Sequence, residues 1–380
     1  MDKTVKYVGF YDLINSKFKR NSSLSAVNKM NYIAETIAHM EQNVEIISPS
    51  WYIDDKAPIT KKQKLNINEK INLAQCPSFP TKNKITGRIK YYFSLIWLFY
   101  YLVRNVKKNE EIVVYHSLAI IKPVLLAKKI KKFKIIYEVE EIYTDVCNYG
   151  KRVRQSEFKI IESAEKYIFP TELLNDKLNK NNKPYSIIYG TYNVEDDVNC
   201  KFDDNIIHVV YAGTFDPRKG GAIAVAAAEY LDENYHIHII GFGSEEEKSN
   251  LKELIKSVSK KTKCKVTYDG LYKGEEYIRF LQKCDIGLST QTPDAEYNDT
   301  SFPSKVLSYM CNGLRVVSVR IKALERSEIN ELLYYYDENT PECIANAIKS
   351  INTQDNYNSR EKIRYLDNKF KNKIKMILEK

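Results

Sequence analysis

The sequence predicts an α/β protein with two doubly wound parallel sheets that face a cleft. Apolar, β-branched runs alternate with amphipathic helical runs along the chain, and this rhythm breaks once, at residues 191–205. The 380 residues also exceed one ordinary core and suit two domains of about 150–200 residues each. We expect a Rossmann-like domain over 1–190, a linker over 191–205, a second such domain over 206–352, and a helical tail over 353–380 that could pack back on the first domain.

The first half alternates strand and helix in the order that a parallel sheet requires. A strand at 6–12 leads into a long polar loop, which precedes the first helix. The remaining elements are expected as strands at 43–50, 110–117, 133–143, 167–171 and 185–190, and as helices at 26–42, 91–103, 118–132, 155–167 and 172–180.

The second half repeats the pattern. Its best-marked helix is 304–312, because Pro303 suits a first helical turn and Gly313 suits the left-handed stop before a strand at 315–319. The other elements are expected as strands that begin at 206, 235, 264 and 285, as helices at 222–232, 244–261, 274–284 and 340–351, and as one or two amphipathic helices in 357–380.

Composition narrows the partners. The net charge of +10 favours an anionic partner, but the lysines are scattered and no aromatic RNA-binding signature is present, so we expect no nucleic acid. The seven cysteines are widely spaced without a Cys-x-x-Cys pair, which predicts reduced thiols, no metal site and a cytoplasmic protein. The first residues lead directly into a strand, with no signal peptide.

The segment 91–103 is apolar and aromatic, with basic residues on both sides. It is too short to span a bilayer, which needs about 20 residues. It can be a buried helix of an α/β domain, or an interfacial helix whose lysines meet anionic lipid, and both can be partly true. The second interpretation would place the protein peripherally on the inner face of the cell membrane.

Three strand ends of the second half point to an anion. Arg218 and Lys219 precede two glycines at one strand end, Gly243 follows another, and Lys305 follows Pro303 at the start of a helix. Small residues let a phosphate approach the backbone, and the adjacent cations can pair with its oxygens. Each signal is weak alone, whereas their convergence on one sheet edge predicts a phosphate site.

The ordered set "GTFDPRKG", "IIGFG", "YDGLY", "DIGLST" and "FPSKVLSYMCNGLRVVS" resembles the donor half of a GT-B glycosyltransferase, most similar to glycosyltransferase family 4. The resemblance covers 207–350 well and the N-terminal half in layout only. It implies transfer of a sugar from a nucleotide diphosphate donor, with retention and without a metal ion or organic cofactor; a UDP-sugar is favoured over a GDP-sugar.

The resemblance also implies the donor contacts. Lys219 matches the family's phosphate-binding lysine, and Gly243 matches a glycine that faces the nucleotide. Tyr268 begins the segment where the base is usually held. The donor-binding residues expected are Gly213, Thr214, Arg218, Lys219, Gly243, Tyr268, Gly270, Thr300, Ser301, Pro303, Ser304, Lys305 and Ser308.

The largest departure from the family lies in the last of these motifs. Relatives carry a Glu-x7-Glu pair where this chain has Thr300 and Ser308, so a hydroxyl would replace the carboxylate that grips the ribose. The chain resembles a subset with a Phe-Pro-Ser-Lys turn, in which the turn and Lys305 take more of the diphosphate. The missing glutamates also leave inactivity open.

The N-terminal half offers catalytic and acceptor candidates. His116 ends a strand where the family's catalytic-site histidine commonly lies, and Glu138 and Glu140 would share one face of the next strand. A carboxylate there could orient an acceptor hydroxyl or act as base. Arg20, Asn21 and Ser22 lie in a loop long enough to bind acceptor or donor phosphate.

These observations predict a hexosyltransferase that serves polysaccharide biosynthesis and takes a saccharide or lipid-linked saccharide acceptor. Two alternatives remain at this stage. A nucleotide-sugar 2-epimerase would share the fold and the donor phosphates, and a non-catalytic GT-B subunit would serve a partner enzyme.

Overall fold

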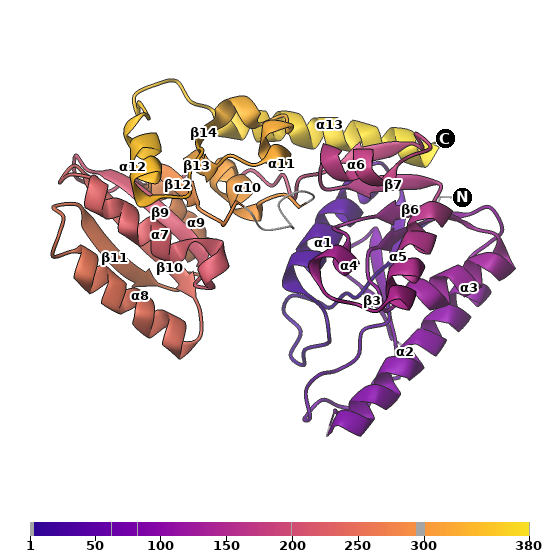
Figure 1. The fold of residues 1–380 in the computed structure, drawn as a ribbon. Helices are drawn as coiled ribbons and strands as arrows, with labels where there is room; N and C mark the ends of the chain where they lie inside the picture. Colours follow the sequence, from indigo (N-terminus) through magenta and orange to yellow (C-terminus); the bar gives the residue numbers. More distant parts are fainter. Residues whose placement is uncertain (1–3, 62, 82, 199, 294–300, 380) are drawn as a thin grey trace. The chain divides into compact units, whose positions relative to one another are not determined.

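The computed structural model describes residues 4–61, 63–81, 83–198, 200–293 and 301–379, which form two units (Figure 1). Unit 1 comprises Met1–Pro170, Leu174–Thr191 and Lys369–Lys380. Unit 2 comprises Thr171–Leu173 and Tyr192–Asn368.

Unit 1 is built on an eight-stranded sheet in the order β3-β4-β2-β1-β5-β6-β7-β8, parallel except where β3 pairs with β4. The strands are β1 (Thr4–Val8), β2 (Asn43–Ser48), β3 (Gln63–Asn66), β4 (Ile71–Gln75), β5 (Glu111–Tyr115), β6 (Lys134–Glu138), β7 (Lys166–Phe169) and β8 (Tyr185–Ile187). The helices of this part of the chain are α1 (Leu24–Ala38), α2 (Lys84–Asn105), α3 (Ile121–Lys131), α4 (Tyr143–Val146), α5 (Lys151–Ser163) and α6 (Glu172–Leu178).

Unit 2 is built on a six-stranded parallel sheet in the order β11-β10-β9-β12-β13-β14. Its strands are β9 (Ile207–Thr214), β10 (Tyr235–Phe242), β11 (Lys265–Gly270), β12 (Ile286–Ser289), β13 (Arg315–Val319) and β14 (Leu333–Tyr336). Its helices are α7 (Gly221–Ala226), α8 (Glu245–Val258), α9 (Gly274–Lys283), α10 (Ser304–Cys311), α11 (Lys322–Glu325) and α12 (Pro341–Lys349), and 3-10 turns include η1 (Pro217–Lys219).

Both cores follow from the strand composition. The central strands carry runs of valine and isoleucine that are buried on both faces, as parallel strands covered by helices require. In unit 1 the helices α2, α3 and α5 pack their apolar sides against β1, β5 and β6 in one continuous core. Helices therefore fill the flanks, and the carboxyl ends of the strands are left to present loops.

The last helix, α13 (Ser359–Glu379), is continuous, and both units use it. Its first residue, Ser359, donates from Oγ to the carbonyl of Met310 at 2.9 Å in unit 2. In unit 1, Phe370 stacks on Tyr32 with ring centroids 5.8 Å apart, and Lys166 donates to the carbonyl of Ile377.

The structure differs from the sequence-based expectation in several elements. The strand expected at 133–143 ends at Glu138, and Tyr143 begins α4 instead. The aromatic helix begins at Lys84, where Asn83 forms a capping box with Thr86. Strands β3, β4 and β14 were not predicted.

Candidate functional site

A cavity of about 490 Å³ in unit 2 opens at the carboxyl ends of β9 and β12 and at the start of α10. This is the edge at which ligands bind in open parallel sheets. It collects eight of the predicted donor residues: Gly213, Thr214, Lys219, Ser301, Pro303, Ser304, Lys305 and Ser308.

Lys305 dominates the electrostatics of this donor cavity. Its Nζ lies 3.8 Å from the centre of the Tyr211 ring and donates to the carbonyl of Lys219 at 3.3 Å. Among the residues that the structure describes, Lys305 forms no ion pair with a carboxylate. Burial, with a smaller contribution from the charge of Lys219, lowers the pKa of Lys305 to about 7. An anion bound in the cavity would supply the negative partner that the Lys305 ammonium group needs.

Gly213 makes room for this lysine. A Cβ atom at Gly213 would lie 2.5 Å from Cε and 2.7 Å from Nζ of Lys305, well inside van der Waals contact. Any residue with a Cβ at position 213 would displace the end of the Lys305 side chain, so this placement of Lys305 requires glycine.

The start of α10 adds backbone donors to the same cavity. Pro303 occupies the N-cap position in an extended conformation, and its own side chain makes no capping hydrogen bond. The first-turn N–H groups and the helix dipole of this eight-residue helix favour an anion at Ser304 and Lys305. As expected from the sequence, Gly313 adopts a left-handed conformation, with φ of 85°, just after the helix.

Other predicted donor residues do not line the cavity. The Arg218 guanidinium turns back to Asp216, with Nη2 2.7 Å from Oδ2, and this pairing lowers the pKa of Asp216 to about 2. Tyr268 packs edge-on against Phe215 with ring centroids 5.6 Å apart. Gly243 and Gly270 are also absent from the lining, and Thr300 lies outside the described residues.

Ser308 has a partner that sequence reasoning missed. The hydroxyl of Tyr277 on α9 lies 3.1 Å from its Oγ, and both residues line the donor cavity. Two hydroxyls therefore stand where the family resemblance implies one glutamate. No local motif marks Tyr277, because its place in the cavity depends on the packing of α9 in the fold.

Unit 1 has a cavity of its own, of about 740 Å³, at the carboxyl ends of β1 and β5 and at the start of α1. It is lined mainly by hydroxyl-bearing, aromatic and aliphatic side chains, including Ser22, Phe10, Tyr143 and Leu118. The lining suits a hydroxyl-rich ligand that stacks on aromatic rings.

His116 reaches this unit 1 cavity and is held from behind by Glu157. Its Nε2 lies 3.2 Å from Glu157 Oε1, and both side chains are fully buried. Glu157 also accepts from the backbone N–H of Tyr143 at 2.8 Å. Burial raises the pKa of Glu157, but its contact with His116 and its hydrogen bonds from Thr144 outweigh this effect and lower the pKa overall. A buried carboxylate beside a histidine can stabilise the charged imidazolium, which suits acid–base or electrostatic work.

Sequence reasoning missed Glu157, although a signal existed. It lies on α5 on the same buried side as Ile160 and Ile161, and a glutamate on the apolar face of an amphipathic helix needs a partner.

Glu138 and Glu140 both approach Lys29, at 3.9 Å and 2.7 Å from its Nζ. Glu138 is fully buried, accepts from the Tyr7 hydroxyl and does not line the cavity. Burial, followed by the charge of Glu140, raises the pKa of Glu138 to about 8. The neighbouring Glu141 lines the cavity instead, because β6 ends early and the chain turns after Glu138.

The predicted loop divides in the structure. Asn21 and Ser22 line the unit 1 cavity. Arg20 is only 3% exposed, and its guanidinium donates to the carbonyls of Ser50 at 2.7 Å and Cys76 at 2.9 Å. The expected phosphate contact through Arg20 is therefore replaced by a structural one, because the side chain is buried and Nη1 donates to both carbonyls.

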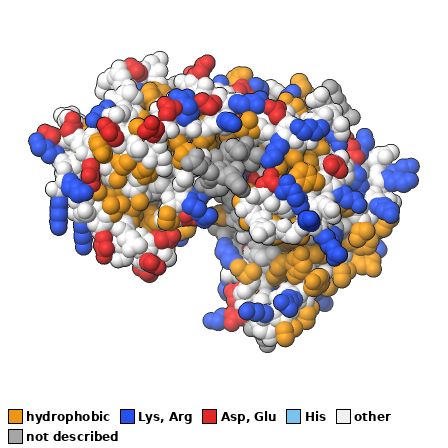
Figure 2. Space-filling model, viewed as in Figure 1, with side chains coloured by type: hydrophobic (Ala, Val, Ile, Leu, Met, Phe, Trp, Pro, Cys, Tyr) orange, Lys and Arg blue, Asp and Glu red, His pale blue; other side chains and the backbone are white. Residues whose placement is uncertain are grey.

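An exposed apolar face runs along α2. Figure 2 shows hydrophobic side chains gathered over α2 and α3 at the lower right. On α2 they are spaced at three or four residues, the period of one helix face: Ile85, Ile89, Tyr92, Phe93, Ile96 and Tyr100. In the described part of the chain, no helix combines the length and apolar character needed to cross a membrane.

A sequence match to a known family covers the sheet and the donor cavity of unit 2. Residues 207–354 match the family described as Glycosyl transferases group 1. Over these residues, unit 2 is similar to that family. This match includes Lys219, Lys305 and both strand ends of the cavity, whereas assignment to glycosyltransferase family 4 stays a prediction. No curated protein matches the chain by sequence.

Solved structures share the fold over the whole length. An E. coli structure described as trehalose-6-phosphate bound with UDP-2-fluoro glucose has a TM-score of 0.68 at 10% identity, covering 100% of this chain and 99% of that one. A glycosyltransferase from Rickettsia africae ESF-5 has a TM-score of 0.67 at 14% identity and coverages of 100% and 97%. Anabaena Alr3699/HepE in complex with UDP and glucose has a TM-score of 0.58 at 11% identity and coverages of 99% and 97%. The chain has the GT-B fold.

Proposed function

We propose that this protein transfers a hexose from a UDP-sugar to a saccharide acceptor, with retention of configuration and without a catalytic metal. The observation that carries the proposal is the donor cavity, in which Lys305 and Lys219 meet the start of α10 within the residues that match the Glycosyl transferases group 1 family. The choice of UDP is supported by the structures of similar fold whose descriptions name UDP or a UDP-sugar.

The cavity explains how a diphosphate could leave without a metal. Lys305 and the first N–H groups of α10 would share the charge that develops on the leaving diphosphate, with Lys219 beside them. Tyr277 and Ser308 would hold the ribose hydroxyls through their own hydroxyls. Retention rests on the family resemblance.

The acceptor would bind in the unit 1 cavity, where aromatic rings can stack on a sugar and hydroxyls can bond to it. His116, oriented by Glu157, would contact the acceptor. A lipid-linked acceptor of polysaccharide biosynthesis is supported by the exposed apolar face of α2, which could rest in an anionic membrane surface with the exposed Lys84 and Arg88 on the headgroups.

The donor assignment is tested with a panel of nucleotide sugars and with two lysine variants. We expect UDP to bind in isothermal titration and a UDP-sugar to be hydrolysed slowly. Lys305→Ala and Lys219→Ala should each lower kcat/KM more than about tenfold, because each removes a charge-assisted contact. Lys322→Ala, an exposed lysine of unit 2, is the matched control. Binding of no nucleotide diphosphate would favour the non-catalytic alternative, and wild-type kinetics in both variants would refute the assignment.

The reaction type has its own tests. NMR of a single nucleotide sugar would detect an epimerised product if the epimerase alternative holds, whereas we expect only hydrolysis. The anomeric configuration of the first released sugar reports retention. Added Mg²⁺ or Mn²⁺ should change turnover less than about twofold, and a larger dependence would contradict a metal-free diphosphate site.

Membrane binding is tested by flotation with vesicles that contain or lack phosphatidylglycerol. We expect binding to the anionic vesicles only, and its loss when Ile89, Phe93 and Ile96 are changed together to serine. Ile59→Ser is the control, since Ile59 is 81% exposed in unit 1 but lies outside α2. Equal flotation of the control and the triple variant would remove α2 from the proposal.

A further inference from the structure

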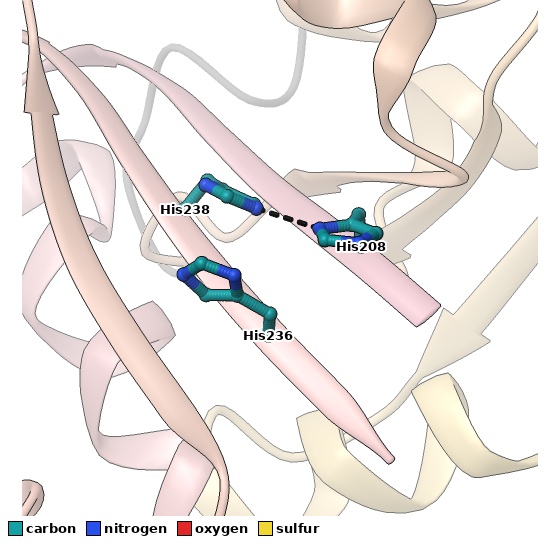
Figure 3. Close-up of side chains that lie close together, drawn as sticks. All are labelled: His208, His236 and His238. Carbon is teal, nitrogen blue, oxygen red and sulfur yellow. Dashed lines mark hydrogen bonds between the residues drawn. The ribbon is translucent and has the colours of Figure 1, made fainter. Parts of the chain in front are cut away.

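Three of the five histidines lie together inside unit 2, away from the donor cavity. His208 is on β9, and His236 and His238 are on the neighbouring strand β10, where His236 pairs in register with His208. Residues two apart on a strand face the same side, so the three rings share one face of the sheet (Figure 3). Their exposures are only 3%, 6% and 2%, and one nitrogen from each ring lies within 4.8 Å of the others.

The outer nitrogen of each ring is already held by an oxygen. His208 Nε2 lies 2.9 Å from Asp204 Oδ1, and His238 Nδ1 lies 3.0 Å from Asp269 Oδ2. Carboxylates accept, so these ring nitrogens carry the hydrogen.

The same reasoning fixes the third ring. His236 Nε2 lies 2.9 Å from Thr267 Oγ1. The Thr267 hydroxyl donates its only hydrogen to Asp269 Oδ2 at 2.8 Å, so it accepts from His236.

The inner nitrogens of the neutral rings then carry no hydrogen, so their lone pairs face one another. With both outer nitrogens donating, neutral His208 and His238 present two lone pairs across 2.9 Å, from Nδ1 to Nε2. His236 Nδ1 adds a third lone pair, to which no residue in the described parts of the chain donates. Facing lone pairs repel, so something positive must lie between them: one shared proton, or a cation.

We propose that His208 Nδ1, His236 Nδ1 and His238 Nε2 bind a divalent transition-metal ion of the zinc class. Metal-binding histidines characteristically donate their other N–H to a carboxylate or another oxygen, and all three do so here. Imidazole nitrogen suits zinc, nickel and copper, whereas Mg²⁺ and Ca²⁺ prefer oxygen. The two carboxylates, Asp204 and Asp269, together carry two negative charges. A divalent ion would balance both charges, whereas one shared proton would balance only one.

The His208–His238 pair needs only a small adjustment. Zn–N bonds of about 2.0–2.1 Å set neighbouring ligand nitrogens about 3.3 Å apart in a tetrahedron. The 2.9 Å separation of His208 and His238 would therefore open by a few tenths of an ångström. Phe202 closes the site from one side, stacked on His208 with ring centroids 3.9 Å apart.

The position assigns the ion a structural role. The histidines lie near the amino ends of β9 and β10, whereas Gly213 and Phe242 line the donor cavity at the opposite ends of the same strands. The ion would fasten the segment that carries Phe202 and Asp204 to the sheet. This inference does not depend on the proposed sugar transfer.

Cobalt binding by tag-free protein tests the proposal directly. We expect about one transition-metal ion per chain by elemental analysis after purification without chelator. After removal of that ion, Co²⁺ should restore one equivalent, give the visible ligand-field absorption of a low-coordinate site and raise the Tm.

Three variants delete the inner nitrogen and keep the outer hydrogen bond. His208→Gln and His236→Gln retain a donor near Nε2, and His238→Asn retains one near Nδ1. Each should weaken Co²⁺ binding at least about tenfold with an unchanged circular dichroism spectrum. His39→Gln, at an exposed histidine on the end of α1, is the matched control and should bind as the wild type.

Substoichiometric metal without Co²⁺ absorption would overturn the proposal and leave the shared proton as the explanation. Unchanged affinity in the three variants would overturn it as well, because the ion would then bind elsewhere. If a variant fails to fold, the elemental analysis and Co²⁺ spectrum of the wild type still decide.

Discussion

The two units place their cavities at the same edge of the sheet but line them with opposite chemistry. Unit 2 presents Lys219, Lys305 and backbone donors at the start of α10, which suits a polyanion. Unit 1 presents aromatic rings, hydroxyls and a histidine fixed by a carboxylate, which suits a ligand rich in hydroxyl groups. The shared architecture sets the place of a site, and a few side chains set what it accepts.

The largest effect should come from Arg20, and it should separate stability from binding. Arg20→Ala leaves the carbonyls of Ser50 and Cys76 without their donor, which should cost about 2–4 kcal/mol of unfolding free energy. Urea denaturation measures this loss, and UDP affinity should not change. Lys19→Ala, an exposed neighbour, should stay within about 0.5 kcal/mol of the wild type. A drop in UDP affinity would contradict the structural role and indicate that Arg20 contacts the ligand.

Gly213→Ala should break the donor cavity without breaking the fold. The added Cβ takes the place of Cε and Nζ of Lys305, so the flexible lysine end must move away. We expect UDP affinity to fall about 10- to 100-fold in isothermal titration, with little change in Tm. Gly150→Ala is the control, since a Cβ there meets nothing within 4 Å. Wild-type affinity would show that the position of Lys305 does not matter.

Glu157→Gln should affect the unit 1 site without affecting UDP binding in unit 2. It keeps the size of the side chain but weakens its hold on His116, so turnover with acceptor should fall about tenfold. UDP affinity should remain that of the wild type. Parallel losses of UDP binding and turnover would contradict the division of work between the units.

The last prediction concerns the pH dependence of UDP binding. Because the pKa of Lys305 is lowered to about 7, the protonated lysine that binds a diphosphate is lost from the free protein as pH rises above 7. The Kd of UDP should therefore rise by up to about tenfold per pH unit between pH 7 and 8.5. Lys305→Arg should flatten this profile, since a guanidinium keeps its proton there. An equally steep profile in the arginine variant would assign the titration elsewhere.

The sequence predicts unit 2 better than unit 1, for a physical reason. The "FPSKVLSYMCNG" stretch carries its own helix start, charge and glycine stop, so local rules place Pro303, Lys305 and Gly313 correctly. In unit 1, His116 and Glu157 come from separate elements, and only the fold brings them together. Arg20 was predicted to bind phosphate, but it is buried. Its partners are backbone carbonyls, which leave no signal in the sequence, so the burial of this charged loop residue could not be inferred.

The histidine cluster shows a third case. His236 and His238 alternate on a strand, and His208 opens the preceding strand, so their common face could be inferred once the strands were assigned. The outer oxygens of Asp204 and Asp269 could not, because the first lies just before β9 and the second on β11. The sequence spacing therefore indicates the three histidines, whereas only the tertiary structure shows the aspartates that orient them.

Helix α13 has a consequence for synthesis on the ribosome. Unit 2 is nearly continuous in sequence, whereas unit 1 waits for residues 369–380 to cover Tyr32 and to bind Lys166. During vectorial translation unit 2 can therefore complete its core while the earlier-made unit 1 still exposes an apolar gap. The half of the protein that is made first is the one that finishes folding last, and a nascent chain stalled before residue 369 would be the species that chaperones need to protect.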